Sequence, residues 1–396
     1  MKKGTRLLGF GVAVLMAASV FAGCSTKTEP ASSPGTGTGT EKKAEPVTLN
    51  LAIAGDTNMV ELYKAIAPEF TKKYPNITLN PVGTGPGDPG SNAIFTKLDA
   101  QNKAGTAKWD LDVAIIHQSI MGPMIENKLL QSYVGGLQNK AMVVGDGAKN
   151  ALGTNVDGYV VPMFQSQIAL AYTEQVKEAP KNFEELVTWI KANPNKFGYN
   201  GVKGGMSGVG FTTSWLYWKT GEYNLLAKGP YDEKKSSGWS AAMKELKALP
   251  TVVTNGNAGT LDMLNRSEIY MGPVWVDMYY TWMREGRMNP KVRLKLIEPG
   301  MTGQPMYFVI PAKAANSEAA RLFIDFMATP EIQAKYIVER NGWYPGVDAA
   351  KVMPLVSQEA KDKLFKDISP EDLAKRGQAF PLAPFLKDVL TAYETN

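Results

Sequence analysis

Apolar and polar positions between residues 47 and 75 follow two different periods in turn. Residues 47–55, VTLNLAIAG, are β-branched and aliphatic with alternating polar positions and end at a glycine, which predicts a strand. The stretch 57–75 then carries apolar side chains at helical spacing, which predicts an amphipathic helix. The apolar positions of this helix are Met59, Leu62, Tyr63, Ile66 and Phe70.

The same alternation of strand and helix continues to residue 117. Residues 76–85 predict a second strand, residues 91–105 a second helix with Ser91 as its N-cap, and residues 109–117 a third strand. Repeated strand–helix–strand units indicate an α/β fold with a mostly parallel sheet flanked by helices.

A long extended segment then separates this series from a second one. Residues 158–173 form a strand-like run with a proline inside it. Residues 182–194 predict a helix, which opens the second series. Residues 266–278 and 292–300 predict two more strands, and residues 307–337 a strand followed by a helix. A chain that leaves one sheet and begins another through an extended segment indicates a hinge.

An aromatic stretch lies early in the second series. In residues 207–223, Phe211, Trp215 and Trp218 fall at the spacing i, i+4 and i+7. If this segment is helical, the three rings lie on one face and belong to the core.

The first 46 residues have a separate character. Lys2, Lys3 and Arg6 precede the apolar run 7–21, which is the layout of a secretory signal peptide, predicted over residues 1–23. Its end, Phe-Ala-Gly-Cys24, resembles the lipobox of bacterial lipoproteins, in which the cysteine is lipidated. An ordinary signal peptide with an incidental cysteine is the alternative. Residues 24–46 have no large apolar side chain and predict a disordered tether.

Cysteine, histidine and charge content limit the chemistry of the remaining chain. Cys24 is the only cysteine, so no intramolecular disulfide can form, and His117 is the only histidine, so no multi-histidine zinc site is expected. Removal of residues 1–23 lowers the formal charge from +5 to +2, which gives no reason to expect a nucleic acid as a partner. We expect no cofactor.

Two later segments carry a family resemblance. Residues 306–347, MYFVIPAKAANSEAARLFIDFMATPEIQAKYIVERNGWYPGV, resemble the late segment of extracellular solute-binding proteins of ABC importers, and residues 268–277, EIYMGPVWVD, are similar to their Gly-Pro-Trp stretch. The resemblance implies a two-lobed periplasmic-binding-protein type II fold, with crossover hinge strands and a central ligand cleft.

The resemblance also implies an organisation and a role. It places residues 47–167 plus 304–340 in an N-terminal lobe and residues 168–303 plus 341–396 in a C-terminal lobe. The protein would be a monomer, held outside the cytoplasm on the cell membrane by its lipid, that closes on a small-molecule solute and presents it to the ABC permease in the membrane.

Candidate contacts follow from the rule that ligands of such sheets bind outside the carboxyl ends of the strands. Glycine-rich turns and strand ends are candidates on this basis, and the tryptophans are candidates because they lie in the family stretches that border the cleft. Each has a structural alternative: a packed glycine connector, a helix cap, a structural histidine or a core tryptophan. The predicted ligand-binding residues are Asp56, Asp88, His117, Gln118, Ser119, Gln165, Ser207, Trp275 and Trp343.

Three functions stay open at this point. A carbohydrate-like solute is favoured because tryptophan faces and neutral polar groups suit hydroxyls. The same rings suit a cation such as a polyamine or thiamine, with Asp56, Asp88 and Asp277 as its carboxylates. A secreted glycosidase, which needs only two carboxylates, is the enzymatic alternative, although we expect a binding protein and no enzyme.

Overall fold

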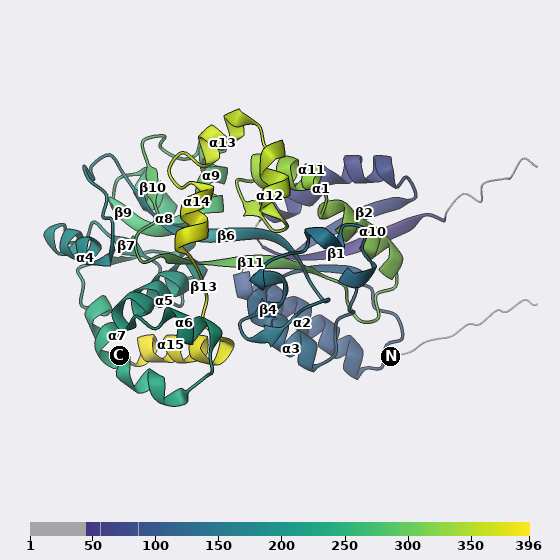
Figure 1. The fold of residues 1–396 in the computed structure, drawn as a ribbon, viewed down its shortest axis with the longest axis horizontal. Coiled ribbons are helices and arrows are strands. Elements are labelled where there is room, and N and C mark those ends of the chain that lie inside the picture. Colours follow the sequence, from purple (N-terminus) through teal and green to yellow (C-terminus); the bar gives the residue numbers. More distant parts are fainter. Residues whose placement is uncertain (1–44, 56, 86) are drawn as a thin grey trace, which may run out of the picture. The chain divides into compact units, whose positions relative to one another are not determined.

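A mixed β-sheet runs through the structure, a computed structural model that describes residues 45–55, 57–85 and 87–396 (Figure 1). Its strand order is β2-β1-β3-β11-β6-β10, with β9 and β12 also paired to β6 and β13 to β11. The strands of this sheet are β1 (Val47–Ala54), β2 (Ile77–Gly85), β3 (Val113–His117), β6 (Val161–Tyr172), β9 (Met271–Trp275), β10 (Arg293–Lys295), β11 (Met301–Val309), β12 (Tyr344–Pro345) and β13 (Gly377–Ala379). Two small sheets pair β4 (Asn150–Ala151) with β5 (Thr154–Asn155) and β7 (Gly198–Tyr199) with β8 (Val252–Val253).

Strand directions differ from the predicted mostly parallel sheet. The neighbours β2, β1 and β3 are parallel, as their βαβ connections require. However, β11 is antiparallel to β3 and to β6, and β6 is antiparallel to β9, β10 and β12. The prediction of a mostly parallel sheet, drawn from residues 47–117, therefore holds for β1, β2 and β3. It is wrong for the sheet as a whole, in which most of the other strand pairs are antiparallel.

Helices cover both faces of the parallel part of the sheet. In Figure 1, α1 and α2 lie on opposite sides of β1. All five apolar positions predicted for the first helix are buried in α1, so that prediction is confirmed. The helices are α1 (Thr57–Lys73), α2 (Gly87–Lys103), α3 (Met121–Glu126), α4 (Phe183–Ala192), α5 (Met206–Thr220), α6 (Tyr223–Lys228), α7 (Ser240–Lys247), α8 (Gly256–Asn265), α9 (Val276–Arg284), α10 (Ser317–Met327), α11 (Pro330–Ile332), α12 (Ala349–Val352), α13 (Gln358–Leu364), α14 (Pro370–Arg376) and α15 (Ala383–Thr395).

Two element boundaries correct the sequence-based prediction. Helix α2 begins at Gly87, so Ser91 is a buried residue inside the helix and not its N-cap. The predicted strand 266–278 is a strand only over Met271–Trp275, and α9 follows at once. The apolar run in residues 266–278 has no clear period, and a short run of this kind does not distinguish a strand from a buried helix.

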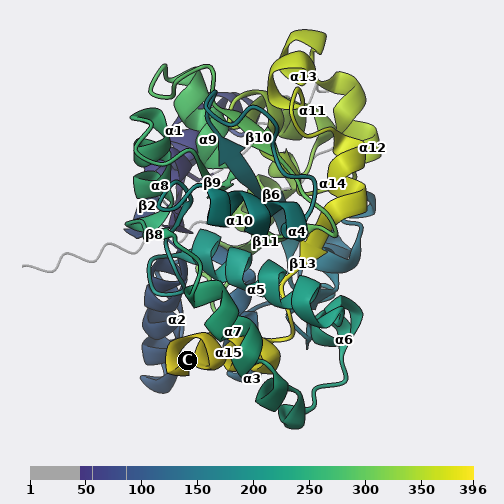
Figure 2. The same ribbon diagram turned by 90° about the vertical axis from the view of Figure 1, so that its left-hand side faces the viewer.

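The hydrophobic core consists of two large clusters. The first contains apolar residues between Leu49 and Phe164 and between Met306 and Val356. The second lies between Ile168 and Met301 and includes Ile368 and Phe380. A smaller cluster joins α5, α6, α7 and α15 (Figure 2). The aromatic face predicted for residues 207–223 is confirmed, because Phe211 and Trp215 are buried in α5 and Trp218 packs against the second cluster.

Two strands, β6 and β11, contribute to both large clusters. The first half of β6, with Val161 and Phe164, belongs to the first cluster, and its second half, from Ile168, belongs to the second. In β11 the order is reversed, with Met301 in the second cluster and Met306 in the first. The lobe boundaries inferred from the sequence remain a prediction; the segment Trp343–Val356, which they assign to the C-terminal lobe, packs in the first cluster.

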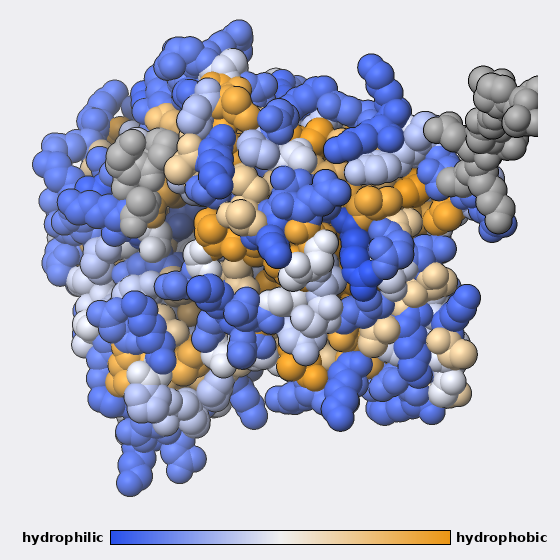
Figure 3. Space-filling model, turned by 45° about the vertical axis from the view of Figure 1, so that its right-hand side comes forward, coloured by the Kyte–Doolittle hydropathy of each residue, from blue (hydrophilic) through white to orange (hydrophobic). Residues whose placement is uncertain are grey.

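On the face drawn in Figure 3, polar side chains cover most of the surface and apolar patches lie between them. Large apolar side chains that are exposed, such as Val82 and Val253, lie on different strands. Isolated apolar residues of this kind are normal on a protein surface and mark no interface by themselves.

We expect Gly90→Ala to destabilise the protein strongly. A Cβ at this position would lie 2.0 Å from the carbonyl oxygen of Gly85, and backbone atoms cannot move aside as a flexible side chain can. Overpacking of this kind costs on the order of 1–3 kcal/mol or more in the free energy of unfolding. Urea denaturation measures this, with Gly135→Ala as control, because nothing lies within 4 Å of the Cβ added there. Equal stability of the two variants would contradict the close approach of α2 to the end of β2.

Candidate functional site

The carboxyl ends of the strands in the two halves of the molecule face each other. On the first side, His117 ends β3 and pairs with Met306 of β11, which pairs with Phe164 of β6. On the second side, Trp275 ends β9 and pairs with Ile168 of β6. On β6, the two edges are therefore marked by Phe164 and Ile168, with only residues 165–167 between them. A rise of four residues along a strand is about 13 Å, which is the separation of the two edges along β6.

The edge of the first half brings together three predicted residues. Ser119 Oγ donates a hydrogen bond of 2.6 Å to Asp88 Oδ1, which joins the start of α2 to the residues after β3. Gln304 Nε2 of β11 donates to His117 Nδ1 at 3.1 Å, and His117 N donates to Ser91 Oγ. Burial lowers the pKa of His117, and the nearby Asp88 carboxylate opposes this only partly.

The edge of the second half presents Trp275 and Asp277 at the start of α9. The backbone N–H of Trp275 donates to Asn257 Oδ1 at 2.8 Å, which fixes this turn against the start of α8. Ser166 Oγ of β6 donates to Asp277 Oδ1. The ring of Trp275 is partly buried against the second core cluster.

Polar side chains form a connected series between the two edges. Ser166 lies directly opposite Gln304 in the antiparallel pair, so their side chains occupy the same face of the sheet. Gln304 bonds to the first edge and Ser166 to the second. We name this series the polar track; its members are Asp88, Ser119, His117, Gln304, Ser166 and Asp277.

Some predicted residues lie outside the polar track. Gln165 neighbours Ser166 and therefore points to the opposite face of β6, where its amide lies beside Gly147. Gln118, after β3, is buried. Ser207 is buried in the first turn of α5 and donates to Asn200 Oδ1.

Trp343 is packed rather than open. Only 1% of its surface is exposed, and its ring stacks on Phe164 with centroids 4.2 Å apart and planes within 9°. A role as a stacking platform for a ligand remains a prediction. Asp56 and the lipidation residue Cys24 lie outside the described residues.

Sequence reasoning missed Ser166 and Gln304. Their side chains bond to groups on the two edges, and Gln304 is 187 residues from His117 in the chain. A signal was present in each strand: the triplet Gln-Ser-Gln at 165–167 interrupts the apolar run of β6, and Gln304 interrupts that of β11. Polar residues inside a buried strand need a partner or a ligand.

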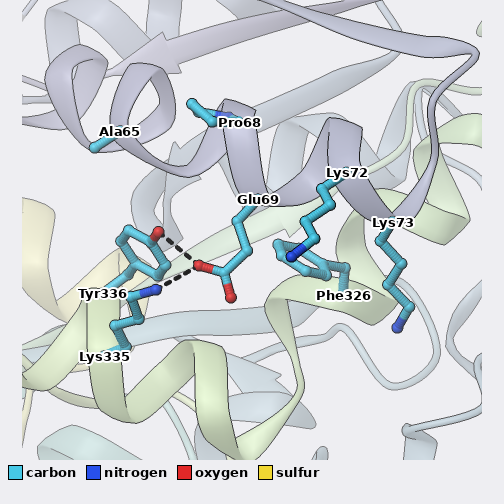
Figure 4. Close-up of a pocket in the computed structure, with 8 residues that line it drawn as sticks. All are labelled: Ala65, Pro68, Glu69, Lys72, Lys73, Phe326, Lys335 and Tyr336. Carbon is cyan, nitrogen blue, oxygen red and sulfur yellow. Dashed lines mark hydrogen bonds and ion pairs between the residues drawn. The ribbon is translucent and has the colours of Figure 1, made fainter.

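A pocket of about 750 Å³ lies elsewhere, on the outer side of α1 (Figure 4). Lys335 Nζ and Tyr336 Oη both donate to Glu69 Oε2, at 2.6 and 2.8 Å. These bonds, that of Lys335 first, lower the pKa of Glu69. The lining of this pocket contains no predicted site residue, and its one carboxylate, Glu69, is already paired. We therefore take the polar track as the candidate site.

Two kinds of structure are absent from the described part of the chain. No helix there has the length and apolar character that crossing a membrane requires. Within the same residues, His, Cys, Asp and Glu form no group of three or more that could hold a metal ion.

Two cores joined by crossing strands, with polar groups between facing strand ends, define a two-lobed binding protein of the periplasmic-binding-protein type II fold. Residues 56–334 match the family model described as bacterial extracellular solute-binding protein. The chain belongs to this family, which confirms the resemblance seen in its sequence.

Solved structures share the fold at low sequence identity. The spermidine/putrescine ABC transporter substrate-binding protein PotD from Streptococcus pneumoniae is 17% identical, with a TM-score of 0.65, 88% of this chain and 98% of that chain covered. The Tp0655 (TpPotD) lipoprotein of Treponema pallidum is 13% identical, with the same TM-score and coverage. MotA from A. tumefaciens B6, in complex with glucopine, is 16% identical with a TM-score of 0.60, again covering 88% and 98%. No curated protein matches the chain.

We expect His117→Gln to reduce the loss of stability in acid. In the unfolded chain His117 titrates near its ordinary pKa of 6.5, whereas burial keeps its pKa in the folded state lower. Below pH 6.5 the unfolded state therefore binds more protons, and the free energy of unfolding falls as the pH is lowered. Urea unfolding at pH 7 and pH 5 should show a smaller difference for the variant than for the unchanged protein. An equal or larger difference would contradict the buried neutral histidine.

Proposed function

We propose that the protein captures a small solute bearing a protonated amine at the polar track and delivers it to the membrane permease of an ABC importer. The observation that carries this is the placement of two carboxylates, Asp88 and Asp277, on facing edges, the second of them two residues after Trp275. A carboxylate forms charge-assisted hydrogen bonds to an ammonium group, and an aromatic face attracts a cation.

The division of the polar track between two cores supports capture by closure. Asp88, Ser119 and His117 belong to elements of the first core, whereas Trp275 and Asp277 belong to elements of the second. A solute that bonds to both sides binds the closed arrangement more tightly than an open one, and this difference in affinity drives closure. Such a role requires no bond to be broken.

Relatives of the same fold support an amine without deciding it. The Streptococcus pneumoniae protein is described as a spermidine/putrescine binder, and both compounds carry protonated amines at neutral pH. A carbohydrate is the second candidate, because Ser119, His117 and Gln304 are neutral groups that pair with hydroxyls. We place the amine first because a neutral sugar does not require two carboxylates.

The proposal includes attachment to the outer side of the cell membrane. The lipobox-like end of the signal peptide assigns Cys24 as the lipidated residue, and residues 24–46 would form the tether. The lipid would keep the solute-binding body close to its permease.

We expect amines to stabilise the protein against heat and Asp277→Asn to remove most of that effect. A solute at about a hundred times its dissociation constant stabilises a fold by about 2.7 kcal/mol. A thermal-shift panel of putrescine, spermidine, γ-aminobutyrate, thiamine, glucose and maltose tests the solute class. Asp262→Asn, at an exposed position on α8, is the matched control and should respond like the unchanged protein. Stabilisation by the sugars alone would replace the amine by a carbohydrate.

We expect Cys24→Ser to release the protein from the membrane, because the only acceptor for the lipid is removed. Fractionation of cells that express each form measures this, with the released protein appearing in the soluble fraction or the medium. Membrane retention of the variant at the level of the unchanged protein would overturn the anchor.

A further inference from the structure

We infer that the solute carries a carboxylate as well as an amine, and that the carboxylate binds where α5 and α8 begin. This inference rests on the proposed function, because both groups belong to one solute at one site. It narrows the solute class to zwitterions of the amino-acid type.

The starts of α5 and α8 lack the negative charge that other helices at this site possess. Helices α2 and α9 carry Asp88 and Asp277 in their first turns, whereas α5 and α8 have no acidic residue there. In the described structure their N-caps, Gly205 and Asn255, also make no side-chain capping bond. The N-terminus of a helix carries about half a positive charge and binds anions.

A buried amide at the start of α5 independently indicates a missing acceptor. Asn200, directly after β7, is only 2% exposed, and within the described residues its Nδ2 has no hydrogen-bond partner. Its Oδ1 accepts from Ser207 Oγ, so the amide is held inside the first turn of α5. A Cβ on Gly205 would lie 3.1 Å from Nδ2, which places this donor against the N-cap. A buried donor without an acceptor is unfavourable, and an incoming oxygen would remove this cost.

The turn beside this amide leaves the start of α5 open to a small ligand. Gly204 and Gly205 are both exposed and have no side chains that could cover the helix start. Gly205 has φ 136°, a backbone angle that favours glycine. The carboxylate oxygens would therefore meet the backbone amides of the first turn, with Asn200 beneath them.

The start of α8 connects this place to the amine site. A Cβ on Gly256 would lie 3.5 Å from the carbonyl oxygen of Gly204, so α8 begins beside the turn that leads into α5. One residue later, Asn257 accepts from the N–H of Trp275 and donates to Met278 Sδ. The strands β7, β8 and β9 share one direction, so all three helix starts lie at one edge. We therefore assign the α5 start and Asp277, which share this edge, to one solute.

Electrostatics separates a zwitterion from the other solutes. A polyamine would place a second ammonium group against the positive starts of α5 and α8, which is unfavourable. A sugar hydroxyl would satisfy a hydrogen-bond donor but would not complement the charge of two helix starts. A carboxylate does both.

The first test varies the solute and leaves the protein unchanged. Isothermal titration compares glycine, β-alanine, γ-aminobutyrate and δ-aminovalerate with their methyl esters and with putrescine. We expect at least one amino acid to bind, and its ester and putrescine to bind at least about tenfold more weakly, a factor that corresponds to 1.4 kcal/mol. Binding of the ester as tight as that of the acid, or tighter binding of putrescine, would overturn the carboxylate while the amine proposal stands. Binding of glucose or maltose alone would overturn both.

The second test varies the protein. Asn200→Asp puts a negative charge at the start of α5, so the best-bound amino acid should lose at least about tenfold in affinity, while its methyl ester should not lose affinity. Asn182→Asp is the matched control, because Asn182 caps α4 with its side chain and aspartate caps equally well. Melting of both apo variants checks that they fold. Unchanged amino-acid affinity in a folded Asn200→Asp protein would contradict the inference.

Discussion

The antiparallel pairing of β6 with β11 is the contact on which the rest of the structure depends. Each strand supplies apolar side chains to one core from one half and to the other core from the other half. Gln167 strengthens the crossing, because its Nε2 donates to the carbonyl oxygens of Met301 and Thr302. The residues of β6 between the two apolar halves, Gln165, Ser166 and Gln167, belong to neither core and are all polar.

This arrangement explains why the site contains both acidic groups and helix starts. Parallel strands end at a common edge, and each is followed by a helix whose positive end lies at the same edge. Where the first turn contains an aspartate, as in α2 and α9, the edge presents a carboxylate. Where it contains glycine and serine, as in α5, the edge presents amide donors. One residue per helix therefore decides whether the strand edge presents a carboxylate or amide donors at that position.

The local sequence pattern was sufficient to predict the helices and the first strands. It was insufficient wherever the direction or the partner of a strand depends on pairing with distant residues. The five buried positions of α1 follow from helical spacing alone. The direction of β11 does not, because it depends on pairing with β3 and β6, which lie far away in the chain. His117 and Ser119 were proposed from a strand end, Asp88 from a glycine-rich turn and Trp275 from the family resemblance. Gln304 acquires its partner only through the register of β11. Trp343 was predicted to contact the ligand, but its ring stacks on Phe164. No local sequence signal distinguishes a packed ring of this kind from one that is open to solvent.

The interleaving of chain segments in the first core also sets an order of folding. Apolar residues as late as Val356 complete a cluster that begins at Leu49, and Asn316 Nδ2 donates to the carbonyl oxygen of Thr48 across 268 residues. During synthesis from the N-terminus, β1 and β3 therefore wait for β11, and no lobe is complete until most of the chain exists. Contacts so distant in sequence form slowly. A newly made chain of this topology therefore stays unfolded for longer than one in which each lobe comes from a single continuous segment.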